Sequence, residues 1–488
     1  MLGGSTKRVN ALVLGIRRGS SYAQTVTRLH ELLQGLSVRR SGRGGELVPK
    51  SAIARFASDY LSLDGASRQK LLEELSKAFT PSLQQVEAAC DRYITAAATS
   101  SQHALLSTQA QQLRHDITPP YETLFRRIAA ESGRGVGFVV DVRDDVLKAQ
   151  RASHSLSSKP SPHLMALDAS LLNMLQSWFG AGFLELQRIS FEATTGSVLE
   201  KIALYEAVHP ISSINELKDR LGHGRRCFAF FHPNLPGEPL IFVHVALVPE
   251  LPGNMKYIHD NTGTAGDEGL ARCAVFYSIS ASKGGLRGVQ LGDSLIQRVC
   301  HELKAELPQL STTATLSPIP KFVSWLCSKV DQQLRLLEQG SVHLSLPLLT
   351  EGEMMALTQV LQREASSGLL KWLKTTLEDG TVLTLDDDVQ QVLELILVRL
   401  AARYLVREQH RRRCPCPVAN FHLSNGAKIW RINWGGDTSS KGVAQSASIM
   451  VNYSYVEEDT EDNSRKYLGA GAVQVSDGVQ ELLDNCTD

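Results

Sequence analysis

The spacing of apolar residues divides the chain into two regions, which differ in the period at which apolar side chains recur. From residue 51 to about residue 180, apolar side chains recur every three or four positions, for example across 67–79, 81–98 and 121–132. This period is that of an amphipathic helix with one buried face. The first region is therefore predicted to be an all-helical bundle domain, which ends with a helix at about 163–180.

After residue 182 the pattern shortens to brief apolar or alternating runs, which are typical of strands. Strands are predicted at 183–191, 227–231, 240–248, 271–280 and 311–316, and helices at 321–338 and 351–410. Near the C-terminus, Asn425-Gly426 separates the apolar runs 418–423 and 429–434, and this dipeptide favours a β-hairpin. The second region is predicted to be a mixed α/β domain.

The segment between the strand at 271–280 and the helix that follows has the composition of an anion site. Residues 281–292 read ASKGGLRGVQLG and include four glycines and the cations Lys283 and Arg287. Glycines let a backbone approach a phosphate closely, and the first turn of a helix offers free N–H groups and a favourable dipole. We expect a nucleotide-like ligand at this loop.

Length and charge narrow the class of protein. The 488 residues suffice for two domains, and 43% hydrophobic with 21% charged residues is ordinary globular composition. No run approaches the roughly 18 apolar residues of a membrane helix. Residues 1–50 hold nine Lys/Arg and two acids, so the totals of 51 and 51 leave 42 basic and 49 acidic residues elsewhere. This mildly acidic body argues against a nucleic-acid-binding protein.

The N-terminal segment has the composition of a targeting peptide. It is rich in Arg and Ser and has no acidic residue before Glu31. These features predict a mitochondrial transit segment over residues 1–45 and a location in the matrix. A disordered basic tail on a cytoplasmic protein is the alternative. The C-terminal residues Asn485-Cys486-Thr487-Asp488 do not match the Ser-Lys-Leu peroxisomal signal.

Two residues are candidate catalytic residues because of their side-chain type and predicted position. His422 is expected on a strand just before the hairpin turn, where an imidazole could protonate a substrate near neutral pH or simply be a satisfied structural residue. Ser317 precedes Pro318 and a helix, which favours a helix N-cap, although its hydroxyl could instead bind a carboxylate. Cys414 and Cys416 have the wrong spacing for zinc, and no metal site is predicted.

Several ordered motifs together resemble one family, malonyl-CoA decarboxylase. These motifs are EAVHPI (206–211), RRCFAFFHPNLPGEPLIFVHVALV (225–248), FYSIS (276–280), LRGVQLG (286–292), LSPIP (316–320), NFHLSNGA (420–427) and WRINW (430–434). The resemblance covers roughly residues 160–470. It implies a helical oligomerisation domain, placed at 46–182, and an acetyltransferase-like (GNAT-type) catalytic domain, placed at 183–488.

The resemblance also implies a reaction and a set of partners. The expected activity converts malonyl-CoA to acetyl-CoA and CO₂ without an added cofactor, and so regulates the malonyl-CoA level and fatty-acid metabolism. The expected assembly is a homo-oligomer, a tetramer by analogy with the family. No nucleic-acid or membrane partner is expected.

Site residues follow from the same resemblance, position by position. His422 is expected to protonate C2 of the substrate, and Ser317 to bind and activate the malonyl carboxylate. The expected malonyl-CoA-binding residues are Arg287, Gly288, Val289, Gln290, Leu291, Gly292, Asp293, Ser278 and Tyr455. Gln290 departs from the family, which often has Glu at this position.

Two other functions remain open from the sequence. The glycine-rich loop would equally serve an acyl-CoA-dependent N-acyltransferase, which would need an amine acceptor and would release free coenzyme A. A non-catalytic acyl-CoA sensor would bind malonyl-CoA without turnover.

Overall fold

The computed structural model describes residues 22–37, 48–99, 103–131, 135–155, 161–260, 268–289, 291–339, 347–362 and 366–484. The chain divides into two compact units. The first comprises residues 1–185 together with 231–240 and 281–290, and the second comprises 186–230, 241–280 and 291–488.

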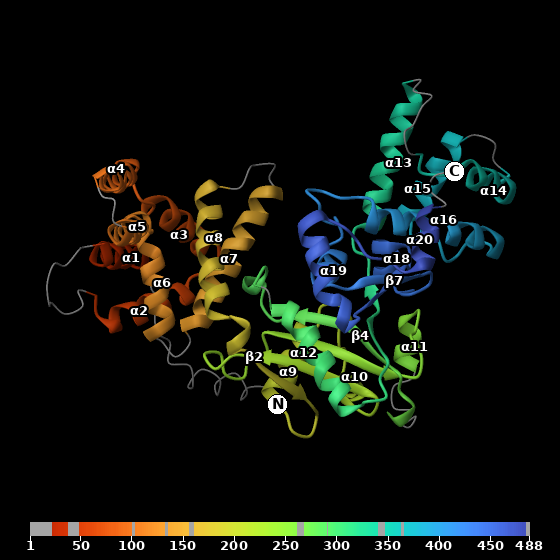
Figure 1. The fold of residues 1–488 in the computed structure, drawn as a ribbon, viewed down its shortest axis with the longest axis horizontal. Helices are drawn as coiled ribbons and strands as arrows, with labels where there is room; N and C mark the ends of the chain where they lie inside the picture. The colour runs from red at the N-terminus through yellow and green to blue at the C-terminus, as the bar shows by residue number, and fades with distance from the viewer. Residues whose placement is uncertain are drawn as a thin grey trace, which may run out of the picture. The chain divides into compact units, whose positions relative to one another are not determined.

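The first unit is helical, as the sequence predicts (Figure 1). Its helices are α1 (Tyr22–Ser37), α2 (Lys50–Ser62), α3 (Gly65–Ala78), α4 (Leu83–Thr99), α5 (His103–Ile117), α6 (Pro120–Glu131), α7 (Gly135–Ser155) and α8 (Pro162–Trp178). Their apolar stripes are buried within the unit, as Leu33, Leu124 and Leu171 illustrate. Asp64 caps α3 by accepting the N–H of Ser67 at 2.8 Å, which satisfies one of the free donors of the first turn.

The second unit is built on a mixed sheet of eight strands. The strands are β1 (Glu185–Ile189), β2 (Arg225–Phe231), β3 (Ile241–Val248), β4 (Cys273–Ala281), β5 (Thr312–Thr315), β6 (Ser317–Pro318), β7 (Lys428–Asn433) and β8 (Met450–Ser454). Their order is β1-β2-β3-β4-β5-β8-β6, and β7 also pairs with β8. The predicted plan, a helical region followed by a mixed α/β region, is therefore confirmed.

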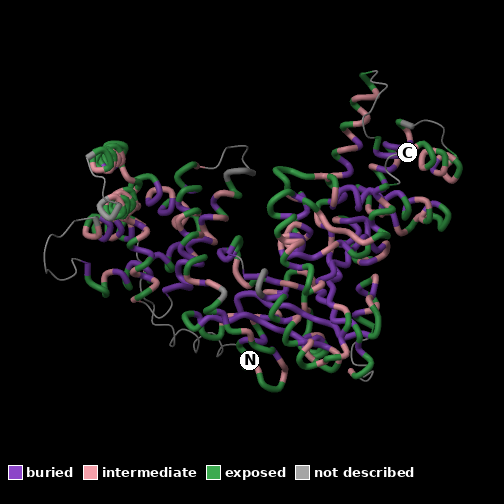
Figure 2. The backbone as a smooth tube through the Cα atoms, viewed as in Figure 1, coloured by how far each residue is buried: buried purple, intermediate pink, exposed green. Residues whose placement is uncertain are grey.

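The central strands form the core of this unit. Strands β2 and β3 are antiparallel and buried along their whole length, whereas β4 and β5 are parallel and are joined through α12 (Leu291–Glu306) (Figure 2). Val275 and Tyr277 of β4 pack in one apolar cluster with Ala246 of β3 and Met450 of β8. Strand β8 runs antiparallel to β5, β6 and β7, so it links the early and late parts of the chain.

The second unit contains further helices. They are α9 (Gly196–Tyr205), α10 (Ile214–Leu221), α11 (Met255–Asp260), α13 (Phe322–Glu338), α14 (Glu351–Leu361), α15 (Ser366–Glu378), α16 (Asp387–Val406), α17 (Pro417–Ser424), α18 (Ser440–Ser446), α19 (Glu457–Ala470) and α20 (Asp477–Asp484). Short 3₁₀ helices occur at η1 (Ala181–Phe183) and η3 (Gly284–Leu286), which belong to the first unit, and at η2 (Glu268–Leu270), which belongs to the second.

The predicted hairpin around Asn425-Gly426 is wrong. Residues 418–423 lie in α17, which has Pro417 in its first turn, and Asn425 is the C-cap of that helix. Gly426 follows with φ of +81°. A Pro at the start and a Gly just past the end are the usual borders of a helix, and here they outweigh the hairpin preference of the dipeptide. His422 is therefore on a helix and not on a strand.

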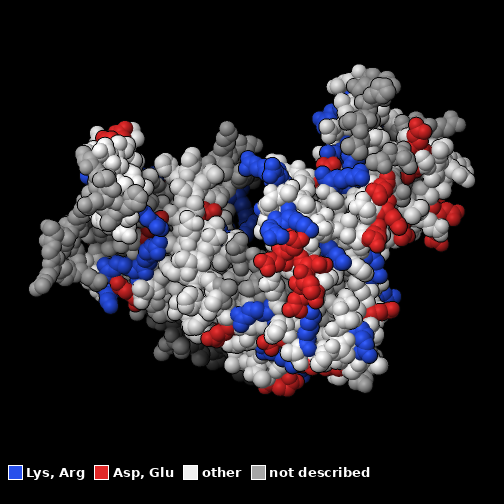
Figure 3. All heavy atoms as spheres, in the orientation of Figure 1, with Lys and Arg blue, Asp and Glu red and all other residues white. Residues whose placement is uncertain are grey.

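The surface carries both signs of charge. Acidic side chains gather over α19, whose first turn contains Glu457, Glu458 and Asp459, and basic side chains lie close by (Figure 3). Among the described residues, no helix is both long enough and apolar enough to span a membrane.

Candidate functional site

Ser317, His422 and Tyr455 form one buried cluster in the second unit. The Oγ of Ser317 lies 3.1 Å from Nε2 of His422, and the hydroxyl of Tyr455 lies 2.8 Å from Nδ1 of the same ring. Both ring nitrogens are thus engaged by neutral hydroxyl groups. The sequence resemblance placed these three residues in one site, and the structure brings them into contact across more than 100 residues of chain.

Sheet pairing and one helix position the cluster. Ser317 opens β6, where it pairs with Val451 of β8, and is not the N-cap of α13, a role that Lys321 takes. Tyr455 directly follows β8, and its N–H donates to the carbonyl of Thr313 at 2.9 Å. The predicted capping role of Ser317 is therefore wrong, and its hydroxyl is available to the cluster.

The His422 ring is held by packing as well as by hydrogen bonds. It stacks on Tyr453 with ring centroids 4.6 Å apart and is only 2% exposed. Burial lowers the pKa of His422 from 6.5 to about 3, because the charged imidazolium loses its hydration. The ring is therefore neutral at physiological pH in the free protein.

The glycine-rich loop packs tightly on helix α7 within the first unit. The buried Arg143 side chain donates through Nη1 to the carbonyl oxygens of Gly285 and Arg287, each at 2.6 Å. Lys283 pairs with Asp141 at 2.8 Å. A Cβ at position 285 would overlap the carbonyl oxygen of Val140, so this glycine allows the loop to meet the helix backbone.

The loop backbone is already partly satisfied. The N–H groups of Leu286, Arg287 and Val289 donate to carbonyls of the same loop, and Gly288 adopts φ of +82°. The Nε2 of Gln176 donates to the carbonyl of Gly288 at 3.1 Å. These contacts constrain residues 283–289, and a preorganised loop lowers the entropy cost of binding a ligand.

The C-terminal end of the loop lies next to the helix that carries His422. Leu291 and Gly292 begin α12, and a Cβ at position 292 would overlap the ring of Phe421. Phe421 precedes His422 on α17, so the absence of a side chain at Gly292 lets α17 pack on the first turn of α12. Gln290 lies outside the described residues, and so does the side chain of Asp293.

Sequence reasoning missed a second buried cluster, centred on Glu206. The hydroxyl of Ser278 donates to both carboxylate oxygens of Glu206 at 2.7 Å, and the hydroxyl of Ser280 donates to one of them at 3.2 Å. The N–H groups of Val208 and His209 donate to the same carboxylate at 2.8 and 3.0 Å. In the sequence this segment, EAVHPI (206–211), stands out as one of the motifs of the family resemblance and as a turn that could rim a pocket, not as a buried carboxylate site. The Ser278 hydroxyl is therefore hydrogen-bonded to Glu206 and not to the Ser317–His422–Tyr455 cluster.

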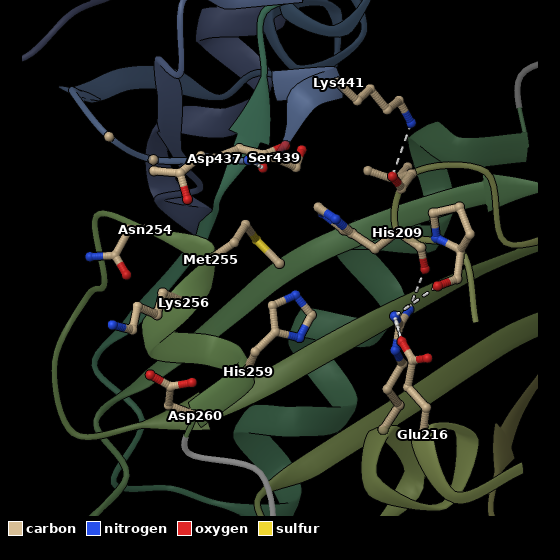
Figure 4. Close-up of a pocket in the computed structure, with 16 residues that line it drawn as sticks. His209, Glu216, Asn254, Met255, Lys256, His259, Asp260, Asp437, Ser439 and Lys441 are labelled. Carbon is tan, nitrogen blue, oxygen red and sulfur yellow. Dashed lines mark hydrogen bonds and ion pairs between the residues drawn. The ribbon is translucent and has the colours of Figure 1, made fainter. Parts of the chain in front are cut away.

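A cavity of about 880 Å³ opens next to this second cluster. It is lined by the loop that follows Glu206, by α10 and α11, and by the segment that leads into α18. Figure 4 shows His209, His259 and Met255 facing its interior, with Asp437 and Ser439 above Met255 in this view. None of the sequence-predicted site residues lines this cavity. Among the described residues, no group of three or more His, Cys, Asp or Glu side chains is placed to hold a metal.

Both halves of the chain match known proteins of one family. The family model of the malonyl-CoA decarboxylase C-terminal domain matches residues 182–488, and the model of the N-terminal domain of the same family matches residues 79–179. Mitochondrial malonyl-CoA decarboxylase of Anser anser anser is 36% identical over 473 residues, which are 96% of this chain and 89% of that protein.

Two further relatives extend this agreement. The mitochondrial malonyl-CoA decarboxylase of Mus musculus is 37% identical over 439 residues, 88% of this chain and 85% of that protein. The crystal structure of malonyl-CoA decarboxylase from Agrobacterium vitis superposes with a TM-score of 0.76 at 32% identity, and covers 94% of this chain and 99% of that chain. Sequence and fold thus point to the same family over nearly the whole length.

Proposed function

Because the chain belongs to the malonyl-CoA decarboxylase family, we propose that it is a carboxy-lyase that converts malonyl-CoA to acetyl-CoA and CO₂, with Ser317 and His422 as its reacting groups. The observation that supports these roles is the buried contact of 3.1 Å between Ser317 Oγ and His422 Nε2. Ser317 binds the malonyl carboxylate by exchanging its bond to Oγ1 of Thr315 for one to that carboxylate, and His422 delivers a proton to C2.

The reaction breaks the bond between C2 and the carboxylate carbon. The electron pair of that bond passes into the thioester as an enolate, and CO₂ leaves. The Nε2–H bond of a protonated His422 then breaks as the C2–H bond forms, so one proton from solvent is consumed in each turnover. Donors aimed at the enolate oxygen lower the barrier most, because the negative charge develops there.

The state of His422 in the free protein fits a substrate-dependent acid. Burial keeps the ring neutral, with a pKa of about 3. A malonyl carboxylate bound at Ser317 would place a negative charge beside the ring, and a nearby opposite charge favours the imidazolium form. The substrate itself thus raises the pKa of the group that will protonate it.

The remaining site residues are assigned to substrate binding. The loop from Arg287 to Asp293 holds the coenzyme A portion, with the exposed Arg287 side chain available for its phosphates. Ser278 would have to exchange a bond to Glu206 for one to the substrate, since its hydroxyl is taken in the free protein.

The proposed location follows two relatives whose names place them in mitochondria, and the proposed assembly follows the family resemblance of the sequence. We assign this chain to the mitochondrial matrix as a homo-oligomer, with a tetramer as the expected state. Residues 22–37 form α1, whose Leu29 and Leu33 are fully buried in the helical unit. The transit segment is therefore expected to end before Tyr22, earlier than the predicted boundary at residue 45.

The decisive test compares the wild-type chain with His422→Asn. Purified wild-type protein is expected to release acetyl-CoA and CO₂ from malonyl-CoA, measured by chromatography of the CoA esters. The variant keeps a polar side chain but loses the acid, and its kcat is expected to fall by about 10²–10⁴-fold. A thermal melt checks that the variant folds.

Other results would contradict the proposal. Binding of malonyl-CoA by the wild-type protein with no turnover would indicate a sensor. Release of free coenzyme A that depends on an added amine would indicate an acyltransferase. A His422→Asn variant with wild-type kcat would remove His422 from the mechanism.

A further inference from the structure

The hydrogen bonds around Ser317 have a direction that follows from the number of protons available. The hydroxyl of Ser317 donates to Oγ1 of Thr315 at 2.9 Å. A serine hydroxyl carries one proton, so its contact with His422 must be one in which Ser317 accepts. The proton between them therefore belongs to Nε2 of His422.

The other side of the imidazole ring is then determined. A neutral imidazole carries one ring proton, and with that proton on Nε2 the Nδ1 atom can only accept. The hydroxyl of Tyr455, 2.8 Å away, must be the donor. Burial of the ring keeps it neutral at physiological pH, which supports this assignment. The hydrogen bonds therefore form a series in which Tyr455 donates to His422, His422 donates to Ser317, and Ser317 donates to Thr315.

Thr315 is held in place by groups outside this series of hydrogen bonds. It is fully buried, and its Oγ1 also accepts the backbone N–H of Tyr453 at 3.2 Å. Its carbonyl accepts the side-chain amide of Asn452 at 2.8 Å. As a β-branched residue on a strand, Thr315 has a restricted χ1 angle. Its Oγ1 is therefore held at the end of the series as an acceptor.

We propose that Thr315 is a positioning residue, which sets the direction of the hydrogen bonds and so places the His422 proton on Nε2, the nitrogen that faces Ser317. The consequence for catalysis rests on the proposed function: there the imidazolium delivers its Nε2 proton to C2, and the neutral ring from which it forms already carries that proton on Nε2. The assignment of the ring proton does not depend on activity. Without Thr315 the Ser317 hydroxyl is free to donate to Nε2, and the ring proton can move to Nδ1.

The test uses the full-length chain with Thr315→Val, Thr315→Ser and the control Thr313→Val. Valine keeps the shape of threonine but removes the acceptor, serine restores it, and Thr313 is a buried threonine of the same strand whose hydroxyl donates to the carbonyl of Tyr455 instead. The ring tautomer is read from imidazole ¹⁵N chemical shifts, with the His422 signals identified by their loss in His422→Asn.

Wild type, Thr315→Ser and Thr313→Val are expected to show the Nε2–H tautomer, whereas Thr315→Val shows a mixture. Loss of one neutral hydrogen bond corresponds to a drop in kcat/KM of about three- to tenfold for Thr315→Val, with recovery in Thr315→Ser. An unchanged tautomer in Thr315→Val, or a serine variant as altered as the valine one, would overturn the proposal. A wild-type protein that shows the Nε2–H tautomer but no decarboxylation would contradict the proposed function and leave the positioning role intact.

Discussion

Two buried histidines of the α/β unit are partnered in opposite ways. His422 has a hydroxyl group at each ring nitrogen, and burial is the only cause that shifts its pKa. His244 is also fully buried, but neither of its nitrogens has a hydrogen-bond partner among the described residues, and Nε2 lies 3.6 Å from the Glu206 carboxylate. One histidine lies in a chain of neutral donors and acceptors, and the other lies beside a fixed charge.

The difference separates a site suited to reaction from one suited to holding structure. Burial acts to raise the pKa of Glu206, yet that pKa is lowered, because His244, Ser278 and the N–H groups of His209 and Val208 together outweigh burial. An ionised carboxylate with so many donors has little to gain from a change in protonation. The His422 ring has no such compensation, so a new charge nearby changes its state easily.

The largest expected effect comes from removing the hydroxyl of Ser317. Ser317→Ala should lower kcat by about 10²–10³-fold, because the malonyl carboxylate would no longer be held beside His422; this is the size of the loss, roughly 2.7–4 kcal/mol, that follows removal of one preorganised donor from an active site. Steady-state kinetics with malonyl-CoA measures it. Ser280→Ala is the matched control, since Ser280 is a buried serine that bonds to Glu206 and should leave kcat unchanged. Equal losses in both variants would erase the distinction between the clusters.

A smaller effect is expected from Glu206→Gln, and on stability rather than chemistry. The substitution keeps the size of the side chain but removes the charge that its donors satisfy. Hydrogen bonds to charged groups contribute about 1.5–3 kcal/mol, so urea unfolding should show a loss of this order. Glu394→Gln, an exposed position on α16, should stay within about 0.5 kcal/mol. A stable Glu206→Gln protein would mean that the second cluster holds no structural charge.

The smallest effect per group is the dependence of stability on pH. Burial lowers the pKa of His422 to about 3 and the pKa values of His244 and His209 to about 4. Below pH 6.5 the unfolded chain binds protons that these folded histidines do not, so stability should fall as pH drops from 6.5 toward 4. The slope is at most about 1.4 kcal/mol per pH unit for each histidine.

This dependence can be measured by thermal melts between pH 7.5 and 4.5. The lowered pKa of Glu206 makes a separate contribution, which is present above pH 4.5 and is lost only at lower pH. His244→Phe should flatten the curve between pH 6.5 and 4.5 relative to the wild-type protein. A wild-type melting temperature that is constant over this range would show that the histidines are not buried as neutral groups.

Much of the fold could be predicted from the sequence, because period and burial are linked directly. The strand predicted at 240–248 is β3, and residues 51–180, which were predicted to be helical, do form helices. The hairpin failed because Asn-Gly suits both a tight turn and the end of a helix. Only the neighbouring Pro417, together with the packing of α17, distinguishes the two cases.

The candidate site was less accessible to sequence reasoning. Ser317 and His422 are 105 residues apart, and they meet through the pairing of β6 with β8 and the packing of α17 on α12, which no local pattern encodes. The resemblance supplied those residues. It included Glu206 in the EAVHPI motif but gave it no role, and it did not include Thr315; the importance of both lies in partners from distant segments of the chain.

The lack of a fixed charge beside His422 has a consequence for what the protein does after each turnover. In the proposed mechanism, acetyl-CoA has neither the carboxylate nor the enolate charge, so once C2 has been protonated no charge of the substrate's reacting group favours the imidazolium form. The ring then returns to a neutral state that neither adds a proton to the product nor readily removes one. If His422 is the acid, the methyl group formed in the reaction should therefore exchange its protons with solvent only slowly, because the negative charge that made the ring acidic has gone.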